Sequence, residues 1–484
     1  MLLREPARPP AVREHRLAPW LAVWTVCFGA FMGQLDASIV TLAFPALQRQ
    51  FAARLAGVQW VSLAYLLVLV ALLVPVGRWS DRLGRKLVYL YGFAVFTGAS
   101  AACGLAPNLA TLIALRMVQA AGAAMLQANS VALVTTCTPS AVRRKALAVQ
   151  AAAQALGLAA GPLIGGLLIA SLGWRWIFLV NVPVGAIAMT AGWFLLPRTH
   201  QLARRQRADP LGMALLAAAA GGALIAVSAL SGLGLPTLLL AGSAAVAVLA
   251  SACLPWWERR SAAPLIDVRV LAATGTAPAL GGALCAYLVL FGPLVLMPQT
   301  LSARGESALQ AGLLLTSLPA GFGLAAVAAE RLLPASWSNR SRCLAGGLLA
   351  AGSAAALAIP APAAVTALLL GVLGIGLGAY IPANNAEIMS AVPASDSATA
   401  GGMVNLARGL GTALGVAVVA LALHAGAGLG LADAGRLAIG VLVTAALAAT
   451  WAGKPRRRRQ LYPGPPWQFT TGPGSTADRP QTEG

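Results

Sequence analysis

The sequence predicts an all-α integral membrane protein with about 14 membrane-spanning helices. Its 484 residues are 58% hydrophobic and only 10% charged, which is typical of polytopic membrane proteins and not of soluble domains. Apolar runs long enough to cross a bilayer as helices recur along the chain. Positive charges collect in every second connection between these runs, as expected for loops on the inner side of a membrane.

The apolar runs fall into a group of six, an inserted pair and a second group of six. The first run follows residue 17 and contains Asp36; because more spans follow it, we expect an uncleaved helix and not a signal peptide. The later runs lie at about 57–76, 87–106, 110–136, 146–172, 176–196, 210–230, 236–255, 275–298, 309–329, 342–359, 364–391, 400–424 and 434–453.

This pattern predicts five parts of the chain. They are a cytoplasmic tail (1–17), an N-terminal six-helix half (18–198), an inserted helix pair with its linkers (199–270), a C-terminal six-helix half (271–453) and a second cytoplasmic tail (454–484). The second tail is rich in Pro, Gly and Arg, so we expect it to be disordered.

The distribution of Lys and Arg predicts the orientation. An N-terminus in the cytoplasm places about 26 of them in inner segments and about five in outer loops. Both termini are therefore expected in the cytoplasm of a multi-pass protein of the cell membrane. The net charge of +20 is then a topology signal that faces anionic lipid, and no nucleic-acid partner is expected.

Small residues line one face of the fifth expected span. Gly157, Gly161 and Gly165 recur every four residues, so another helix can approach this face very closely. Pro162 removes a backbone hydrogen bond and is expected to bend the helix there. The spacing alone fits an ordinary packing seam equally well.

Neighbouring segments give this seam a family resemblance. The run Gly161 to Gly166 (Gly-Pro-Leu-Ile-Gly-Gly) is followed by Trp174-Arg175-Trp176-Ile177-Phe178 and by Asn181-Val182-Pro183. These segments resemble the antiporter motif and the next loop of the major facilitator superfamily, most closely the fourteen-span drug:proton antiporters of the EmrB/QacA type. The resemblance implies an exporter built on the two-half major facilitator fold, although Ala148 stands where that family often has a further Gly.

Asp36 is the acid expected deep inside a span. A charged side chain there costs about 2.5–3.5 kcal/mol on the insertion scale, so a function or an ion pair must justify it. The surrounding run from Leu35 to Pro45 resembles the first-span motif of the fourteen-span family, with Ser38 and Thr41 in place of Thr and Asn. We expect Asp36 to carry protons; a purely structural ion pair is the alternative.

Arg116 and Gln119 share one face of the fourth expected span. They resemble the superfamily's Arg-x-x-Gln-Gly motif, with Ala120 in place of Gly. Arg116 lies roughly 9 Å from the outer end of its span, and Asp36 lies at a similar depth in the first span. We therefore expect the two side chains to pair, and proton uptake by Asp36 to bias alternating access.

A charged connection joins the second and third spans. Its residues 77–86 include Gly77, Asp81, Arg82, Gly84 and Arg85 and resemble the superfamily's signature loop. Glycines allow a tight turn, and Asp81 could pair with an Arg or with a helix N-terminus. A latch for one conformational state is the functional interpretation, and a plain positive-inside loop is the alternative.

Polar residues also occur at the inner ends of the last spans. Asn384, Asn385 and Arg408 lie in stretches that look like the fourteen-span family, and we expect them to take part in substrate binding or proton coupling. Arg408 could contact substrate or another helix, or could extend to the lipid surface as a snorkelling side chain. Two intramembrane cations, Arg116 and Arg408, against one clear acid favour a neutral, zwitterionic or anionic substrate.

The sequence thus predicts a proton-coupled exporter of drugs or secondary metabolites, such as an antibiotic made by the host, that acts as a monomer. It contains no ATP-binding Gly-x-x-x-x-Gly-Lys-Ser/Thr loop and no metal-ligand or catalytic spacing, so we expect neither a cofactor nor an enzyme. The alternatives are a metabolite symporter on the same fold, which the glycine motif disfavours, and a sensor or scaffold without transport, which would usually carry a soluble signalling domain.

Overall fold

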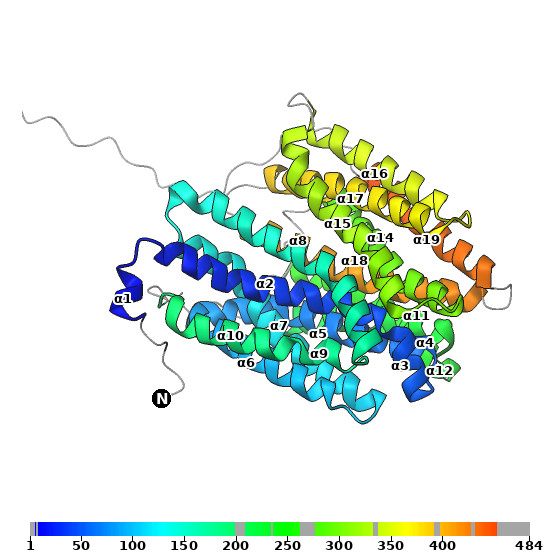
Figure 1. Ribbon diagram of the computed structural model, residues 1–484, viewed down its shortest axis with the longest axis horizontal. Helices are drawn as coiled ribbons and strands as arrows, with labels where there is room; N and C mark the ends of the chain where they lie inside the picture. The colour runs from blue at the N-terminus through cyan, green and yellow to red at the C-terminus, as the bar shows by residue number, and fades with distance from the viewer. Residues whose placement is uncertain are drawn as a thin grey trace, which may run out of the picture.

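The computed structural model describes residues 5, 8–198, 209–233, 236–261, 276–332, 337–391, 397–426 and 431–452. These residues form long, roughly parallel helices joined by short connections (Figure 1). The expected tail 454–484 and the loop 199–208 lie outside them.

The N-terminal bundle comprises the helices up to residue 195, after the short helix α1 (Pro10–Arg13). They are α2 (Ala18–Leu42), α3 (Phe44–Phe51), α4 (Leu55–Val58), α5 (Trp60–Leu83), α6 (Arg85–Gly104), α7 (Leu109–Cys137), α8 (Ser140–Ser171), α9 (Trp176–Leu179) and α10 (Asn181–Leu195). Asn108 caps α7 by accepting a hydrogen bond from the backbone N–H of Thr111 at 2.8 Å.

The C-terminal bundle comprises the helices from residue 277 onward. They are α14 (Ala277–Ala303), α15 (Ala308–Leu332), α16 (Asn339–Ala356), α17 (Ala363–Ala391), α18 (Ser397–Gly426) and α19 (Leu431–Ala452). Between the bundles in sequence lie α11 (Pro210–Ser228), the π-helical turn η1 (Ala229–Leu233) and α12 (Thr237–Glu258), which pack on each other and contact α5 and α18 through α11.

Twelve of the described helical segments are long and apolar enough to cross a membrane. The expected eleventh and fourteenth spans correspond to α16 and α19, which fall short of this standard. Helix α16, with 18 residues, is long enough but not apolar enough, because it carries Arg340 and Arg342 in its first turn. The apolar stretch of α19, Gly435–Trp451, is shorter than the twelve segments.

The long helices run between two opposite ends of the molecule (Figure 1). The terminal end is where α2 begins at Ala18 and where α5 meets α6 at Gly84. The far end is where α8 turns toward α9 at Gly173 and α14 turns toward α15 at Gly305. Gly84, Gly173 and Gly305 all have positive φ, which a residue with a side chain rarely adopts.

The expected glycine face of α8 packs against α2. A Cβ atom added to Gly157 would lie 2.4 Å from the carbonyl oxygen of Phe31. A Cβ on Gly165 would lie 2.7 Å from the side chain of Ile39. The absence of side chains therefore sets the close approach of these two helices, as the spacing predicts.

The two bundles meet along α8 with α15 and along α5 with α18, while α14 also contacts α2 and α3. At the far end, a Cβ on Gly166 would lie 2.6 Å from the carbonyl oxygen of Ala308, and one on Gly312 would lie 2.3 Å from that of Pro162. Gln299 also donates a hydrogen bond to Gln48 across this end at 2.8 Å. The bundles are thus tightly closed at the far end.

Candidate functional site

Asp36 lies fully buried in α2 at the centre of a polar cluster. Arg116 of α7 donates a hydrogen bond from Nη1 to Asp36 Oδ2 at 2.7 Å, which forms a buried ion pair. Gln119 donates to Asp36 Oδ1 at 3.0 Å, and Asn181 of α10 donates to the same oxygen at 3.5 Å. The expected pairing of Asp36 with Arg116 is therefore present, and the carboxylate accepts from three side chains.

Arg116 is only 1% exposed and is held on several sides. Its Nε donates to the carbonyl oxygen of Val61 at 3.0 Å, and Nη1 also donates to Gln119 Oε1 at 2.6 Å. The guanidinium lies over the Tyr65 ring, 4.1 Å from its centroid, and 5.7 Å from that of Phe178. These contacts hold the cation in one geometry and compensate its removal from water.

Gln119 connects the ion pair to α6. Its amide nitrogen donates to Asp36 and, at 2.7 Å, to Ser100 Oγ, while its amide oxygen accepts from Arg116. Ser100 in turn donates to the carbonyl oxygen of Phe96 at 2.8 Å. In each of its hydrogen bonds within this cluster Asp36 is the acceptor, so the cluster is built for a deprotonated carboxylate.

A cavity of about 580 Å³ lies between the two bundles. Helices α2, α5, α7 and α8 face α14, α15, α17 and α18 across it. Its lining residues lie from the middle of α7, α8, α15, α17 and α18 toward the terminal end, whereas those of α2 and α5 lie mainly in the far-end halves of these two helices. Apolar side chains form most of its wall. Its polar lining residues are Gln34, Tyr65, Gln127, Gln154, Tyr287, Asn405, Arg408 and Thr412.

Arg408 of α18 lines this cavity from the C-terminal bundle. It is half-buried and donates from Nη2 to Gln127 Oε1 of α7 at 2.9 Å. This hydrogen bond joins the two bundles across the cavity. The side chain therefore points into the protein, which favours a contact with substrate or another helix over a snorkelling role.

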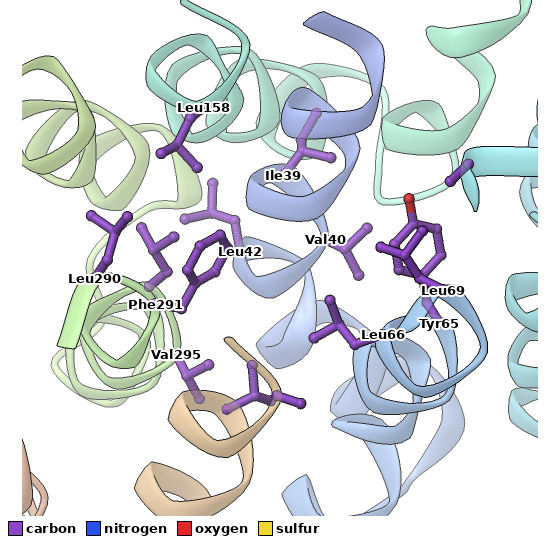
Figure 2. Packing of buried hydrophobic residues seen from close by; sticks show 14 of the residues in the cluster. Ile39, Val40, Leu42, Tyr65, Leu66, Leu69, Leu158, Leu290, Phe291 and Val295 are labelled. Carbon is purple, nitrogen blue, oxygen red and sulfur yellow. The ribbon is translucent and has the colours of Figure 1, made fainter. Parts of the chain in front are cut away.

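Tyr65 separates the cavity from the ion pair. Its ring lines the large cavity on one side and covers Arg116 on the other. A small second pocket beside it is also lined by Arg116, together with Ser62 and Thr412. Figure 2 shows α2 between the helix that carries Tyr65, Leu66 and Leu69 and the helix that carries Leu290 and Phe291.

Other expected site residues lie away from the cavity. Asn384 is buried and donates to the carbonyl oxygen of Ala279 at 2.9 Å, which ties α17 to α14. Asn385 is half-buried, and neither residue is among the described lining residues. Gly161 packs on Ser38 of α2, so the glycine motif reaches the helix that carries Asp36 without contributing a polar group.

The connection 77–86 is mostly helical. Helix α5 continues through Gly77 to Leu83, and only Gly84, with a φ of 106°, forms the turn into α6 that starts at Arg85. The side chains of Asp81 and Arg82 lie outside the part of the chain that the structure describes. Gly77 lies within α5 and not in a turn. It packs on α7, where a Cβ atom added to it would lie 3.9 Å from that of Ala128.

The N-terminal segment packs against this connection. Glu5 Oε1 accepts a hydrogen bond from the backbone N–H of Leu87 at 3.3 Å, in the first turn of α6. Lys86 is fully buried and donates to the carbonyl oxygens of Trp193 and Leu196, at 2.9 and 2.7 Å. These bonds tie the start of α6 to the end of α10.

Several polar residues of the site are not evident from the sequence alone. Tyr65, Ser100, Gln127 and Tyr287 are single polar groups in apolar spans. Gln127 follows Arg116 by eleven residues, close to three helical turns, and this spacing is the signal that places it on the same face. Among the described residues, no group of three or more His, Cys, Asp or Glu side chains could hold a metal ion.

Comparison with known proteins identifies the family. The model of the Major Facilitator Superfamily matches residues 26–416. The methylenomycin A resistance protein of Streptomyces coelicolor is 32% identical over 425 residues, which are 86% of this chain and 88% of that protein. The riboflavin transporter RibZ of Clostridioides difficile is 30% identical over 409 residues, which are 82% of this chain and 87% of that protein.

A solved structure shows the same fold. A bacterial homologue of the human lysosomal transporter Spinster, in an inward-facing and unoccupied conformation, superposes with a TM-score of 0.64 at 17% identity. The match covers 91% of this chain and 98% of that one. On its sequence and its fold, this chain belongs to the major facilitator superfamily of transporters.

Proposed function

We propose that the protein is a proton-coupled antiporter that exports drugs or secondary metabolites across the cell membrane. The observation that carries this proposal is the buried Asp36–Arg116 pair, set beside a cavity between two helix bundles. A carboxylate at this depth is costly, and in transporters such groups commonly mark proton routes. The similarity to an antibiotic resistance protein supports the class of cargo.

Protonation of Asp36 is the coupling step in this proposal. The charged carboxylate accepts from Arg116, Gln119 and Asn181, which holds α2, α7 and α10 together. A proton on Asp36 removes the charge that pairs with Arg116, so this cluster loses its strongest contact. The equilibrium between conformations then shifts, because the pair stabilises one of them more than the other.

The described conformation is proposed to be inward-facing. The bundles are closed at the far end by Gly166, Gly312 and the bond between Gln48 and Gln299. The cavity reaches instead toward the terminal end. If the Lys- and Arg-rich connections place the terminal end and both tails in the cytoplasm, the substrate enters from there.

We infer 14 spans, because α16 and α19 pack against the other helices of the C-terminal bundle. Helix α16 packs on α17 and α19, and α19 also packs on α14 and α18. Gly347 in the middle of α16 meets Thr450 near the end of α19, so the two helices are in close contact. The domains are then two six-helix halves (18–198 and 271–453) around the inserted pair (199–270), in a protein that acts as a monomer.

Two motifs are assigned conformational roles. The seam of Gly157, Gly161, Pro162, Gly165 and Gly166 seals the far end, since its two faces pack on α2 and α15. The connection of Gly77, Asp81, Arg82, Gly84 and Arg85 is proposed to latch the halves when the cavity faces outward.

The direction of proton movement tests the proposal. The protein would be reconstituted in vesicles with an imposed pH gradient, and lumenal pH would be recorded as a panel of antibiotics is added. Antiport predicts that compounds and protons cross in opposite directions. The variant Glu306→Gln removes an exposed carboxylate at the far end, and it should behave as the wild type in this assay.

Two other outcomes would replace the proposal. Movement of protons in the same direction as a compound would indicate a symporter, an alternative that the similarity to a riboflavin transporter keeps in view. No transport of any compound or metabolite, by a protein that melts cooperatively and binds ligand, would indicate a membrane sensor or scaffold.

A further inference from the structure

We propose that the central cavity selects a planar, partly apolar substrate that carries an anionic group, and that this group displaces the Gln127 amide oxygen from Arg408. This inference rests on the proposed function only in treating the cavity as the substrate site. It adds the chemical class of the substrate and the way in which its binding loosens the two bundles.

The charge of the cavity favours a substrate with an anionic group. Arg408 is the one charged side chain among the described residues that line it. Within the described part of the chain, it pairs with Gln127 and Tyr287, and neither is an acid. A cation held in an apolar wall without a counter-ion among the described residues favours an anion and disfavours a second cation, because charges interact strongly where water is scarce.

The aromatic wall of the cavity favours a planar substrate. Four aromatic rings line the cavity, Tyr65 from α5, Tyr287 and Phe291 from α14, and Phe322 from α15. Aromatic side chains prefer offset or edge contacts with a planar ring system. The amides of Gln34, Gln154 and Asn405 supply neutral hydrogen-bonding groups around these rings. A flat molecule with one anionic end satisfies both parts of this wall.

The hydrogen bond between Arg408 and Gln127 is the link that an anionic substrate would replace. It joins α18 of one bundle to α7 of the other at 2.9 Å. A carboxylate or phenolate oxygen is a stronger acceptor for a guanidinium than an amide oxygen is. An anion that reaches Arg408 therefore replaces Gln127 and removes one link between the bundles. Substrate binding would then favour the rearrangement that transport requires.

Three anthracenes that share one ring system and carry an anionic, a neutral or a cationic substituent at the same position test the inference by binding alone. The probes are anthracene-9-carboxylate, 9-anthracenemethanol and protonated 9-(aminomethyl)anthracene, each followed by its own fluorescence anisotropy at pH 7.5 with the full chain in nanodiscs. We expect the carboxylate to bind about ten-fold more tightly than the alcohol, or better, and the ammonium probe to bind most weakly.

Four variants separate a binding role from a structural one. Arg408→Gln should remove the preference for the carboxylate and leave binding of the alcohol unchanged, whereas Arg408→Lys should retain part of the preference. Gln127→Ala should increase affinity for the carboxylate, because the competing acceptor is gone. Arg304→Gln removes an exposed arginine at the far end and should change nothing. Thermal unfolding of each variant checks that it is folded.

The inference is overturned if the ammonium probe binds as well as the carboxylate, if Arg408→Gln keeps the preference, or if none of the three probes binds. Failure of the proposed function gives a different pattern. Selective binding of the carboxylate, without any proton movement in the vesicle experiment, would leave the anion site standing and remove the antiporter proposal.

Discussion

Replacing Tyr65 tests the link between the cavity and the buried ion pair. Its ring lies 4.1 Å from the guanidinium carbon of Arg116, and both side chains are 1% exposed. A desolvated cation–π contact is worth about 2 kcal/mol, or roughly thirty-fold in an equilibrium constant. Tyr65→Leu removes this contact and the cover between the cavity and Arg116, so protons should reach Asp36 without substrate.

The assay is the proton leak of reconstituted vesicles without any substrate. Tyr65→Leu should increase this leak by about ten-fold or more. The lost cation–π contact corresponds to a change of roughly thirty-fold in the equilibrium that keeps Arg116 covered by the ring. Tyr65→Phe should behave as the wild type, because the hydroxyl group has no hydrogen-bond partner among the described residues. An equal leak in the Phe and Leu variants would refute the role given to the ring.

Three further changes address the seal, the polar cluster and the terminal end. Gly166→Val should open the far end, because overpacking this contact costs about 1–3 kcal/mol. A cysteine that replaces Gln48 should then react faster with a thiol reagent. Gly98→Ala should not change this labelling rate, because the space around its Cβ position is open. Gln119→Leu should slow coupled transport by about five-fold or more, since it removes a buried donor to Asp36 worth about 1–3 kcal/mol. Unchanged transport would exclude the amide from coupling. Lys86→Met should lower the melting temperature in detergent, because it leaves the buried carbonyl oxygen of Leu196 and the partly buried one of Trp193 without this donor. An unchanged melting temperature would contradict that account.

Helix positions and one ion pair could be predicted from the sequence for clear physical reasons. Each apolar run must satisfy its own backbone in lipid, so a helix is the only local solution. Asp36 and Arg116 are opposite charges at equal depth, and the cost of leaving either unpaired makes their contact predictable. The four-residue spacing of Gly157, Gly161 and Gly165 predicts a close helix contact in the same way.

The partners of these residues could not be predicted, because they depend on how the bundles pack. Nothing in the sequence says that Tyr65 covers Arg116 or that Gln127 reaches Arg408. Asn384 is one of the expected substrate residues, yet its side chain donates to the backbone of α14. The residues after Gly77 read as a loop, but α5 continues to Leu83, since polar residues at the end of a span can stay helical outside the membrane.

The central claim is that Asp36 couples proton movement to substrate movement. It is tested most directly by comparing two modes of transport in Asp36→Asn, for a compound that the wild type carries. The account predicts that the variant still exchanges labelled for unlabelled compound at equal concentrations, because the cavity is intact, but no longer accumulates it when a pH gradient is imposed. Accumulation driven by the gradient at the wild-type rate would contradict the account.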